Sequence, residues 1–294
     1  MKVLLTGASG YIGSAVADAL KRAGHSVVGL ARSSDAERKC KEHGIIPTRG
    51  DLTDPVSVAI AARNVDAVIW TATTNDAAVD TAAVAAALDS VSGAGKSFIY
   101  TSGVWVHGNT NDKVLDENAP LKPIQLVEWR PEVEQRVLRT QGLRGMVIRP
   151  GIVYGRGAGI PAMLVASGRD HGIVQFVGDG ENRWPVVHVE DLADLYVLAL
   201  EKGSTGSVFL GVADAPVKVR DIAEAASEAA GVAGKVAAWP LEQARQKLGP
   251  FADALALDQQ FSSQRAQDLL GWNPSRPGIL EELRAGSYVG KKAG

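Results

Sequence analysis

Residues 6–13, Thr6-Gly7-Ala8-Ser9-Gly10-Tyr11-Ile12-Gly13, connect an apolar run at residues 3–5 to a segment of helical periodicity at residues 15–20. This order predicts a strand, a tight turn and a helix. Gly7 can take backbone angles that a side chain forbids, Gly10 lets a pyrophosphate approach the backbone, and Gly13 lets the helix lie close to the strand. Because the first N–H groups of a helix are unpaired and sit at its positive end, the segment predicts a phosphate-binding turn rather than a plain connection.

The composition of the 294 residues narrows the class of protein. Hydrophobic residues make up 46%, enough for a sizeable core, and the net charge of −2 with mixed signs gives no indication of a nucleic-acid or membrane partner. Cys40 is the single cysteine, which excludes an internal disulfide and a cysteine metal site. Glycines interrupt the first apolar run too early for a signal peptide, and no apolar stretch has the length of a membrane span. We therefore expect a cytoplasmic protein without a metal site.

Short apolar runs alternate with helical segments through the first half of the chain. Strands are expected at residues 26–30, 44–49, 66–70, 97–101 and 144–149. This alternation predicts a doubly wound parallel sheet, the Rossmann-type α/β fold, and it is lost after residue 155. We expect a dinucleotide-binding domain from residues 1–153 plus 186–211. A smaller, mostly helical substrate domain is expected from residues 154–185 plus 212–294.

The spacing T-G-x-x-G-x-x-G and the later segment Arg149-Pro150-Gly151-Ile152-Val153-Tyr154-Gly155 resemble the extended branch of the short-chain dehydrogenase/reductase family. That branch contains epimerases, dehydratases and reductases, and the resemblance covers nearly the whole chain. It implies that Asp51 and Leu52 border the adenine of a dinucleotide and that residues 71–73 lie beneath it. The cofactor-binding residues that we expect are Gly7, Ser9, Gly10, Tyr11, Ile12, Gly13, Arg32, Asp51, Leu52, Thr71, Ala72, Thr73, Arg130 and Pro150.

Arg32 indicates which dinucleotide binds. It follows the second expected strand, where an acidic residue holds the ribose 2′-hydroxyl of NAD and an arginine accommodates the 2′-phosphate of NADP. A guanidinium pairs well with a phosphate. We therefore expect NADP(H) to be the cofactor.

The family's catalytic residues are only partly present. Ser102, at the end of the fifth expected strand, matches by position the serine that hydrogen-bonds the reacting carbonyl or hydroxyl. The family's Tyr-x-x-x-Lys pair is replaced: with the following glutamate aligned on Glu134, Arg130 stands at the lysine and Leu126 at the tyrosine. Arginine can still donate hydrogen bonds to the nicotinamide ribose, whereas leucine has no proton to give. Pro131 predicts that the regular helix begins near Arg130.

The proton must then come from another group, and three sources are open. Tyr154 is the nearest substitute phenol, although a tyrosine packed behind the cofactor is the competing interpretation. His107 lies in a loop expected at the carboxyl ends of the strands and is a candidate acid or base, with a solvated histidine as the alternative. Water is the third source.

Together these residues predict an NADP(H)-dependent oxidoreductase that acts on a small carbonyl or hydroxyl compound. Two alternatives stay open: a protein that binds NADP without catalysis as a sensor, and a non-redox isomerase or lyase that retains the cofactor. The presence of Ser102 favours a catalytic function, and Leu126 at the tyrosine position favours a protein without catalytic activity. The resemblance also implies a homodimer as one outcome, because two helices of such domains often form a dimer face.

Overall fold

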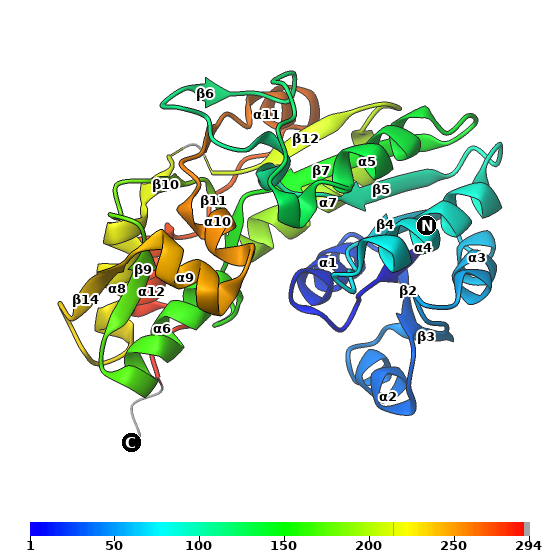
Figure 1. Ribbon diagram of the computed structural model, residues 1–294. Helices are drawn as coiled ribbons and strands as arrows, with labels where there is room; N and C mark the ends of the chain where they lie inside the picture. The colour runs from blue at the N-terminus through cyan, green and yellow to red at the C-terminus, as the bar shows by residue number, and fades with distance from the viewer. Residues whose placement is uncertain (214, 291–294) are drawn as a thin grey trace.

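The computed structural model describes residues 1–213 and 215–290, and its centre is a seven-stranded parallel sheet. The order across the sheet is β12-β7-β5-β4-β1-β2-β3 (Figure 1). The strands are β1 (Lys2–Thr6), β2 (Ser26–Ala31), β3 (Ile46–Arg49), β4 (Ala67–Trp70), β5 (Ser97–Thr101), β7 (Arg144–Pro150) and β12 (Val208–Gly211). Because β2 and β4 lie on opposite sides of β1, the strand order reverses there and leaves a crevice at the carboxyl ends. The predicted doubly wound parallel sheet is confirmed.

Helices cover both faces of the sheet. One face packs against α1 (Tyr11–Arg22), α7 (Val189–Lys202) and α11 (Gln264–Leu270), and the other against α3 (Pro55–Arg63), α4 (Ala77–Val91) and α5 (Arg130–Arg139). The short helix α2 (Ser34–Glu42) lies beside β2 and β3. Asp54 and Asp76 begin α3 and α4 by accepting hydrogen bonds from backbone N–H groups of the first turn, as helix N-caps do.

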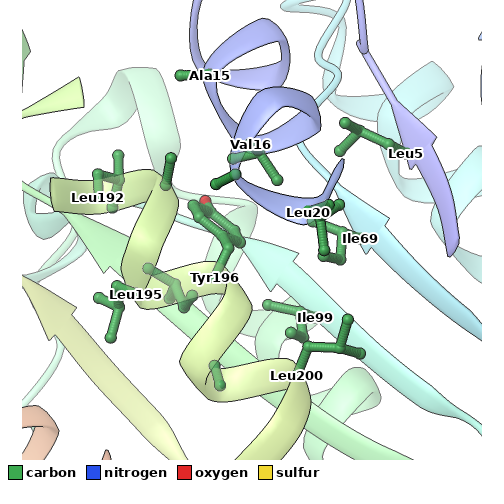
Figure 2. Close-up of a cluster of buried hydrophobic side chains, with 14 of the residues drawn as sticks. Leu5, Ala15, Val16, Leu20, Ile69, Ile99, Leu192, Leu195, Tyr196 and Leu200 are labelled. Atoms are coloured by element: carbon green, nitrogen blue, oxygen red, sulfur yellow. The ribbon is translucent and has the colours of Figure 1, made fainter. Parts of the chain in front are cut away.

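Side chains from α1 and α7 meet over the middle strands of the sheet (Figure 2). Val16 and Leu20 come from α1, Leu195 and Tyr196 come from α7, and Ile99 comes from β5. All five are fully buried. The Tyr196 hydroxyl lies 2.6 Å from the hydroxyl of Thr101, so α7 is hydrogen-bonded to the carboxyl end of β5. This core fixes the strand ends on which the candidate site is built.

A second, smaller core lies beyond the end of β7. It contains β8 (Ile152–Tyr154), α6 (Gly159–His171), β9 (Val174–Val177), β10 (Arg183–Trp184), β11 (Val186–His188), β13 (Val217–Lys218), α8 (Val219–Ala229), β14 (Val236–Trp239) and α12 (Ile279–Ala285). Beside them lie α9 (Leu241–Leu248) and α10 (Phe251–Ala256), which share a small cluster with β9. The short strands β6 (Val114–Leu115) and β15 (Gln260–Phe261) form a separate parallel pair.

The packing departs from the expected domain ranges in two places. Strand β11, within the range expected to return to the main sheet, pairs instead with β8, and the return is made by α7 and β12. Residues 264–272, within the range expected for the substrate domain, pack on the main sheet. Trp272 is buried there, and its indole N–H donates to the backbone oxygen of Asp191 at 2.8 Å. Asp214 and residues 291–294 of the expected substrate domain lie outside the described residues. Within the described part of the chain, no helix is long and apolar enough to cross a membrane.

Candidate active site

A cavity of about 700 Å³ opens at the crevice between β1 and β4. It brings together residues from the glycine turn, the end of β2, the loop after β3 and the loop after β4. From the expected cofactor residues it is lined by Gly7, Ser9, Gly10, Tyr11, Ile12, Gly13, Arg32, Asp51, Leu52, Thr71, Ala72 and Thr73. Arg130 and Pro150, the remaining two, line an adjoining cavity described below.

The glycine turn has the geometry that close phosphate approach requires. Gly7 has a φ of +71°, and its carbonyl oxygen accepts a hydrogen bond from Gly10 N at 2.8 Å. A Cβ atom on Gly13 would lie 2.0 Å from that same oxygen, so only glycine lets α1 pack this closely on the turn. Gly10 caps α1 without a side-chain hydrogen bond. Residues 9–13 line the cavity, and the first N–H groups of a helix are unpaired and lie at its positive end, an arrangement that suits an anion.

The loop after β4 is held rigid by Asp80, which sequence reasoning missed. Asp80 is only 2% exposed and lies in the first turn of α4. Its carboxylate accepts hydrogen bonds from the Thr73 hydroxyl at 2.6 Å and from the hydroxyl and backbone N of Thr74 at 2.8 and 2.9 Å. Thr71 is fixed separately, since its hydroxyl donates to Thr6 O at 2.7 Å. The cavity floor is thus preorganised. A threonine-rich loop followed by a first-turn carboxylate is the signal that could have revealed it.

Arg32 is exposed at the rim of the 700 Å³ cavity. Within residues 1–213 and 215–290, no carboxylate lies within ion-pair distance of its guanidinium. Asp51, the acid that lines the same cavity, is engaged elsewhere: one of its oxygens accepts from the backbone N and the hydroxyl of Thr53, both at 2.9 Å. These hydrogen bonds, and to a smaller degree Arg32, lower the pKa of Asp51. The positive charge of Arg32 is therefore available to an anionic ligand.

A second cavity, of about 300 Å³, lies at the carboxyl ends of β5 and β7, and we call it the reaction cavity. Tyr11 and Ile12 line both cavities, so the two adjoin at the start of α1. The walls of the reaction cavity are mostly apolar. They include Trp105, Leu126, Val127, Trp129, Pro150, Ile152, Val153 and Ile160, together with Ser102 and Arg130.

Ser102 and Arg130 each place beside this cavity a polar atom that has no partner within residues 1–213 and 215–290. The Ser102 hydroxyl is buried and makes no hydrogen bond, although its backbone N is fixed by Ile148 O at 2.8 Å. The Nη1 atom of Arg130 donates to Ser102 O at 2.9 Å, and its buried Nε has no acceptor. The guanidinium carbon lies 5.2 Å from the centre of the Trp129 ring. A buried polar group without a hydrogen-bond partner lowers stability, so both atoms suit a site in which a bound ligand supplies the missing partner.

The sequence profile of the NAD dependent epimerase/dehydratase family matches residues 3–210, which spans the sheet, the glycine turn, Ser102 and Arg130. The chain belongs to this family.

Proteins with similar sequences align with most of this chain. A Saccharomyces cerevisiae protein, YLL056C, is 36% identical over 301 aligned residues, which cover 97% of this chain and 98% of the yeast protein. The 2-alkyl-3-oxoalkanoate reductase of Stenotrophomonas maltophilia is 28% identical over 232 residues, covering 72% of this chain and 69% of the reductase. The solved Thermus thermophilus UDP-glucose 4-epimerase, in complex with NAD, superposes with a TM-score of 0.78 at 22% identity, covering 99% of this chain and 100% of the epimerase. The last comparison shows the shared fold.

Leu126 and Arg130, the residues that the sequence analysis places at the Tyr and Lys positions, both lie at the edge of the reaction cavity. Helix α5 begins at Arg130, with Pro131 next to it, as the sequence predicts. Leu126 lies one turn earlier, in a 3₁₀ turn at Gln125–Val127, and lines the cavity. Among the described residues that line this cavity, Tyr11 alone carries a phenol, and its hydroxyl donates to Gly155 O at 3.0 Å.

Tyr154, a candidate proton donor in the sequence analysis, does not line the reaction cavity, and its phenol is engaged by another part of the chain. The Tyr154 hydroxyl donates to Pro277 O at 2.8 Å, and its ring packs edge-on against His188 with the ring centres 5.3 Å apart. Burial raises the pKa of the Tyr154 phenol. In this structure the Tyr154 side chain therefore packs between His188 and the backbone of Pro277.

His107, the other candidate acid or base, also lies away from the reaction cavity. The side chain is 2% exposed and lies outside the reaction cavity. Its Nε2 accepts from Arg149 Nη1 at 3.1 Å, and Arg149 is paired with Glu134 through Nε at 3.1 Å and Nη2 at 2.5 Å. Burial, followed by the positive charge of Arg149, lowers the pKa of His107 to about 4. The imidazole is therefore neutral at physiological pH and acts as a structural acceptor, neither a solvated side chain nor a catalytic acid.

Proposed function

We propose that this chain is an NADP(H)-dependent reductase of a small carbonyl compound. The observation that carries the proposal is the pair of buried, partnerless polar atoms, Ser102 Oγ and Arg130 Nε, beside a cavity that adjoins the larger one at Tyr11 and Ile12. The name of the Stenotrophomonas relative, a 2-alkyl-3-oxoalkanoate reductase, supports carbonyl reduction. The nicotinamide dinucleotide in the solved Thermus neighbour supports the cofactor class.

The larger cavity suits the dinucleotide. The first turn of α1 offers N–H groups to the pyrophosphate, and Gly7, Gly10 and Gly13 leave room for it. Arg32 offers a cation with no competing carboxylate to the adenosine ribose, which supports a 2′-phosphate and therefore NADP(H) over NAD(H). The nicotinamide, when bound, supplies hydride to a carbonyl carbon.

The residues of the reaction cavity then have separate roles. The Ser102 hydroxyl donates a hydrogen bond to the acceptor oxygen and stabilises the negative charge that develops there. Arg130 has a free Nε for the nicotinamide ribose, while its Nη1 fixes the carboxyl end of β5. Leu126 provides no proton, and Tyr154 and His107 lie outside the cavity. Of the three proton sources open in the sequence, water is left. The balanced reaction consumes one carbonyl compound, one NADPH and one proton, and yields an alcohol and NADP⁺.

The test is hydride transfer from NADPH deuterated at the transferring position to a panel of ketones and enones. The expected result is a deuterium at the former carbonyl carbon of an alcohol product, with one NADPH oxidised per alcohol formed. Conversion of a substrate without label transfer and without net NADPH oxidation would contradict simple reduction and favour a non-redox reaction.

Leu126 favours a second candidate, a protein that binds NADP(H) and performs no chemistry. General acid catalysis contributes roughly 10²–10⁴-fold to the rate, so a leucine in place of the acid is consistent with slow turnover or with none. The same panel separates the two functions: tight NADPH binding with no oxidation against any acceptor supports the sensor.

A further inference from the structure

A third cavity, of about 130 Å³, lies inside the smaller core, and we call it the tail cavity. Helices α6, α9 and α10 and strands β9 and β14 enclose it. Its lining is apolar except for Ser167 and Gln175, and includes Ile160, Met163, Trp239 and Leu255. The Ser167 hydroxyl is already paired with Ile173 O at 3.4 Å.

The tail cavity and the reaction cavity adjoin at Ile160, which lines both. A second connection runs through α10. Trp105 of the reaction cavity packs edge-on against Phe251 with the ring centres 6.1 Å apart, and Leu255 of the same helix lines the tail cavity. The tail cavity therefore offers apolar space on the other side of Ile160 from a ligand in the reaction cavity.

Cations that could bind a diphosphate substrate are engaged elsewhere in this region. Arg156 pairs with Glu190 at 2.6 Å and Asp18 at 3.1 Å. Arg183 pairs with Asp258 at 3.2 Å.

Arg169 donates to the backbone oxygens of Tyr288 and Ala229. None of these three arginines lines either cavity. Among the described residues that line the two cavities, Arg130 is the one cation, and its Nη1 is bonded to a backbone carbonyl.

We propose that the tail cavity is a binding subsite for an apolar tail of the substrate. The substrate is then an uncharged ketone or enone with an alkyl or phenyl-sized group, rather than a nucleotide sugar. This inference rests on the proposed reductase function for the position of the carbonyl. An apolar cavity of about 150 Å³ in another protein holds benzene. The tail cavity is slightly smaller, so it accepts a group of about five or six carbons.

The test measures dissociation constants for methyl ketones from 2-butanone to 2-undecanone by calorimetry, with and without NADP⁺. The oxidised cofactor cannot reduce a ketone, so binding is read without turnover. Each buried methylene contributes about fourfold in affinity. We expect affinity to rise along the series for the unmodified protein.

Two neighbouring substitutions on α6 isolate the subsite. Ser167→Leu fills the tail cavity, and Ala166→Leu adds the same side chain at an exposed position outside it. Ser167→Leu is expected to weaken binding of 2-undecanone about tenfold or more and leave 2-butanone unchanged, whereas Ala166→Leu changes neither. Met163 is 52% exposed and also lines the cavity, so Met163→Asp gives a second variant that alters the rim without filling the interior. It is also expected to weaken 2-undecanone binding.

Equal affinities for 2-undecanone in the unmodified protein and in both cavity variants would overturn the tail subsite, as would the absence of ketone binding. NADPH oxidation tests the reductase function separately from ketone binding. Length-dependent binding that Ser167→Leu abolishes, with no NADPH oxidation, supports the subsite and contradicts the reductase. Ketone reduction with no dependence on chain length or on either variant contradicts the subsite and leaves the reductase intact.

Discussion

Arg130 Nη1 donates a hydrogen bond to the backbone oxygen of Ser102 at 2.9 Å, which joins the start of α5 to the carboxyl end of β5. The side chain that we assign to the cofactor ribose thus also fixes the residue that we assign to the substrate oxygen. Nη1 lies 3.4 Å from a second carbonyl oxygen, that of Thr101.

Arg130→Ala is therefore expected to have two effects. NADPH binding weakens by about 10- to 100-fold, because one charged hydrogen bond contributes roughly 1.5–3 kcal/mol. The melting temperature also falls, because backbone carbonyls lose their donor. The control is Arg136→Ala on the same helix, whose ion pair with Asp89 is exposed and contributes little. NADPH titration and thermal unfolding check both effects, and equal NADPH affinity in the two variants would contradict the assigned role.

Ser102→Ala removes a buried hydroxyl that has no protein partner. Its loss is expected to leave thermal stability unchanged or slightly higher, to change NADPH affinity by less than about twofold, and to lower kcat by about 10²-fold. Ser90→Ala, which removes a hydroxyl bonded to Ala87 O on α4, is the control and should retain full turnover. A fall in NADPH affinity that matches the fall in kcat would contradict a role at the substrate oxygen.

Arg32→Ala tests the cofactor preference. We expect the unmodified protein to bind NADPH at least about tenfold more tightly than NADH, a difference of about 1.4 kcal/mol, and the variant to lose most of that difference. Arg38→Ala is the control, since Arg38 is exposed on the neighbouring helix α2 and pairs with Asp35 and Glu42. Titrations with both cofactors provide the measurement. Equal affinities in the unmodified protein would exclude the 2′-phosphate assignment.

His107 predicts a specific dependence of stability on pH. Its pKa is about 4 in the folded chain, against the ordinary 6.5, so the unfolded chain binds more protons between these values. The free energy of unfolding contributed by His107 is complete above about pH 6.5 and is lost as pH falls to about 4, by about 3 kcal/mol. His107→Gln keeps an acceptor for Arg149 and does not titrate. Urea unfolding at pH 7.5 and pH 4.5 should show a smaller difference for the variant, and equal differences would contradict a neutral native imidazole.

Leu126→Tyr places a phenol at the edge of the reaction cavity, at the position where the resemblance implies the family's tyrosine. If water is the native proton source, kcat should rise by about 10²-fold and then decline as pH increases through the pKa of the new phenol. Leu126→Phe adds the same ring without the hydroxyl and should give no gain. The measurement is the pH dependence of kcat for the two variants. An equal change of kcat in both would show that the ring's packing, and not its hydroxyl, causes the effect.

Features that depend on a few neighbouring residues were predicted well. The glycine turn, the strand at 97–101 and the start of α5 beside Pro131 follow from local backbone preferences, and the structure has each where the sequence indicates it. The fold class follows in turn, because strands that alternate with helices leave few topologies.

Features that depend on contacts between distant segments were not predicted. The bond of Arg149 to His107 joins residues 42 positions apart, and the bond of Tyr154 to Pro277 joins residues 123 positions apart. Neither leaves a periodic or compositional signal, so a loop histidine and a lone tyrosine looked available for catalysis. Pairing of β11 with β8 rather than with the main sheet is a tertiary outcome of the same kind.

Because Trp272 packs against α7, the main core of this protein is completed only late in its synthesis. Helix α7 covers Ile99, Met146 and Ile148, and Trp272 closes the same core. When synthesis has reached residue 153, the strands that carry these three residues have been made, but α7 and Trp272, which cover them, have not. Roughly 120 more residues must follow before Trp272 is made, which takes on the order of ten seconds at 5–20 residues per second. Helix α7 is made earlier, at residues 189–202, so until Trp272 follows only the part of this core that Trp272 and α11 cover stays exposed to water, where apolar surfaces of incomplete chains can associate.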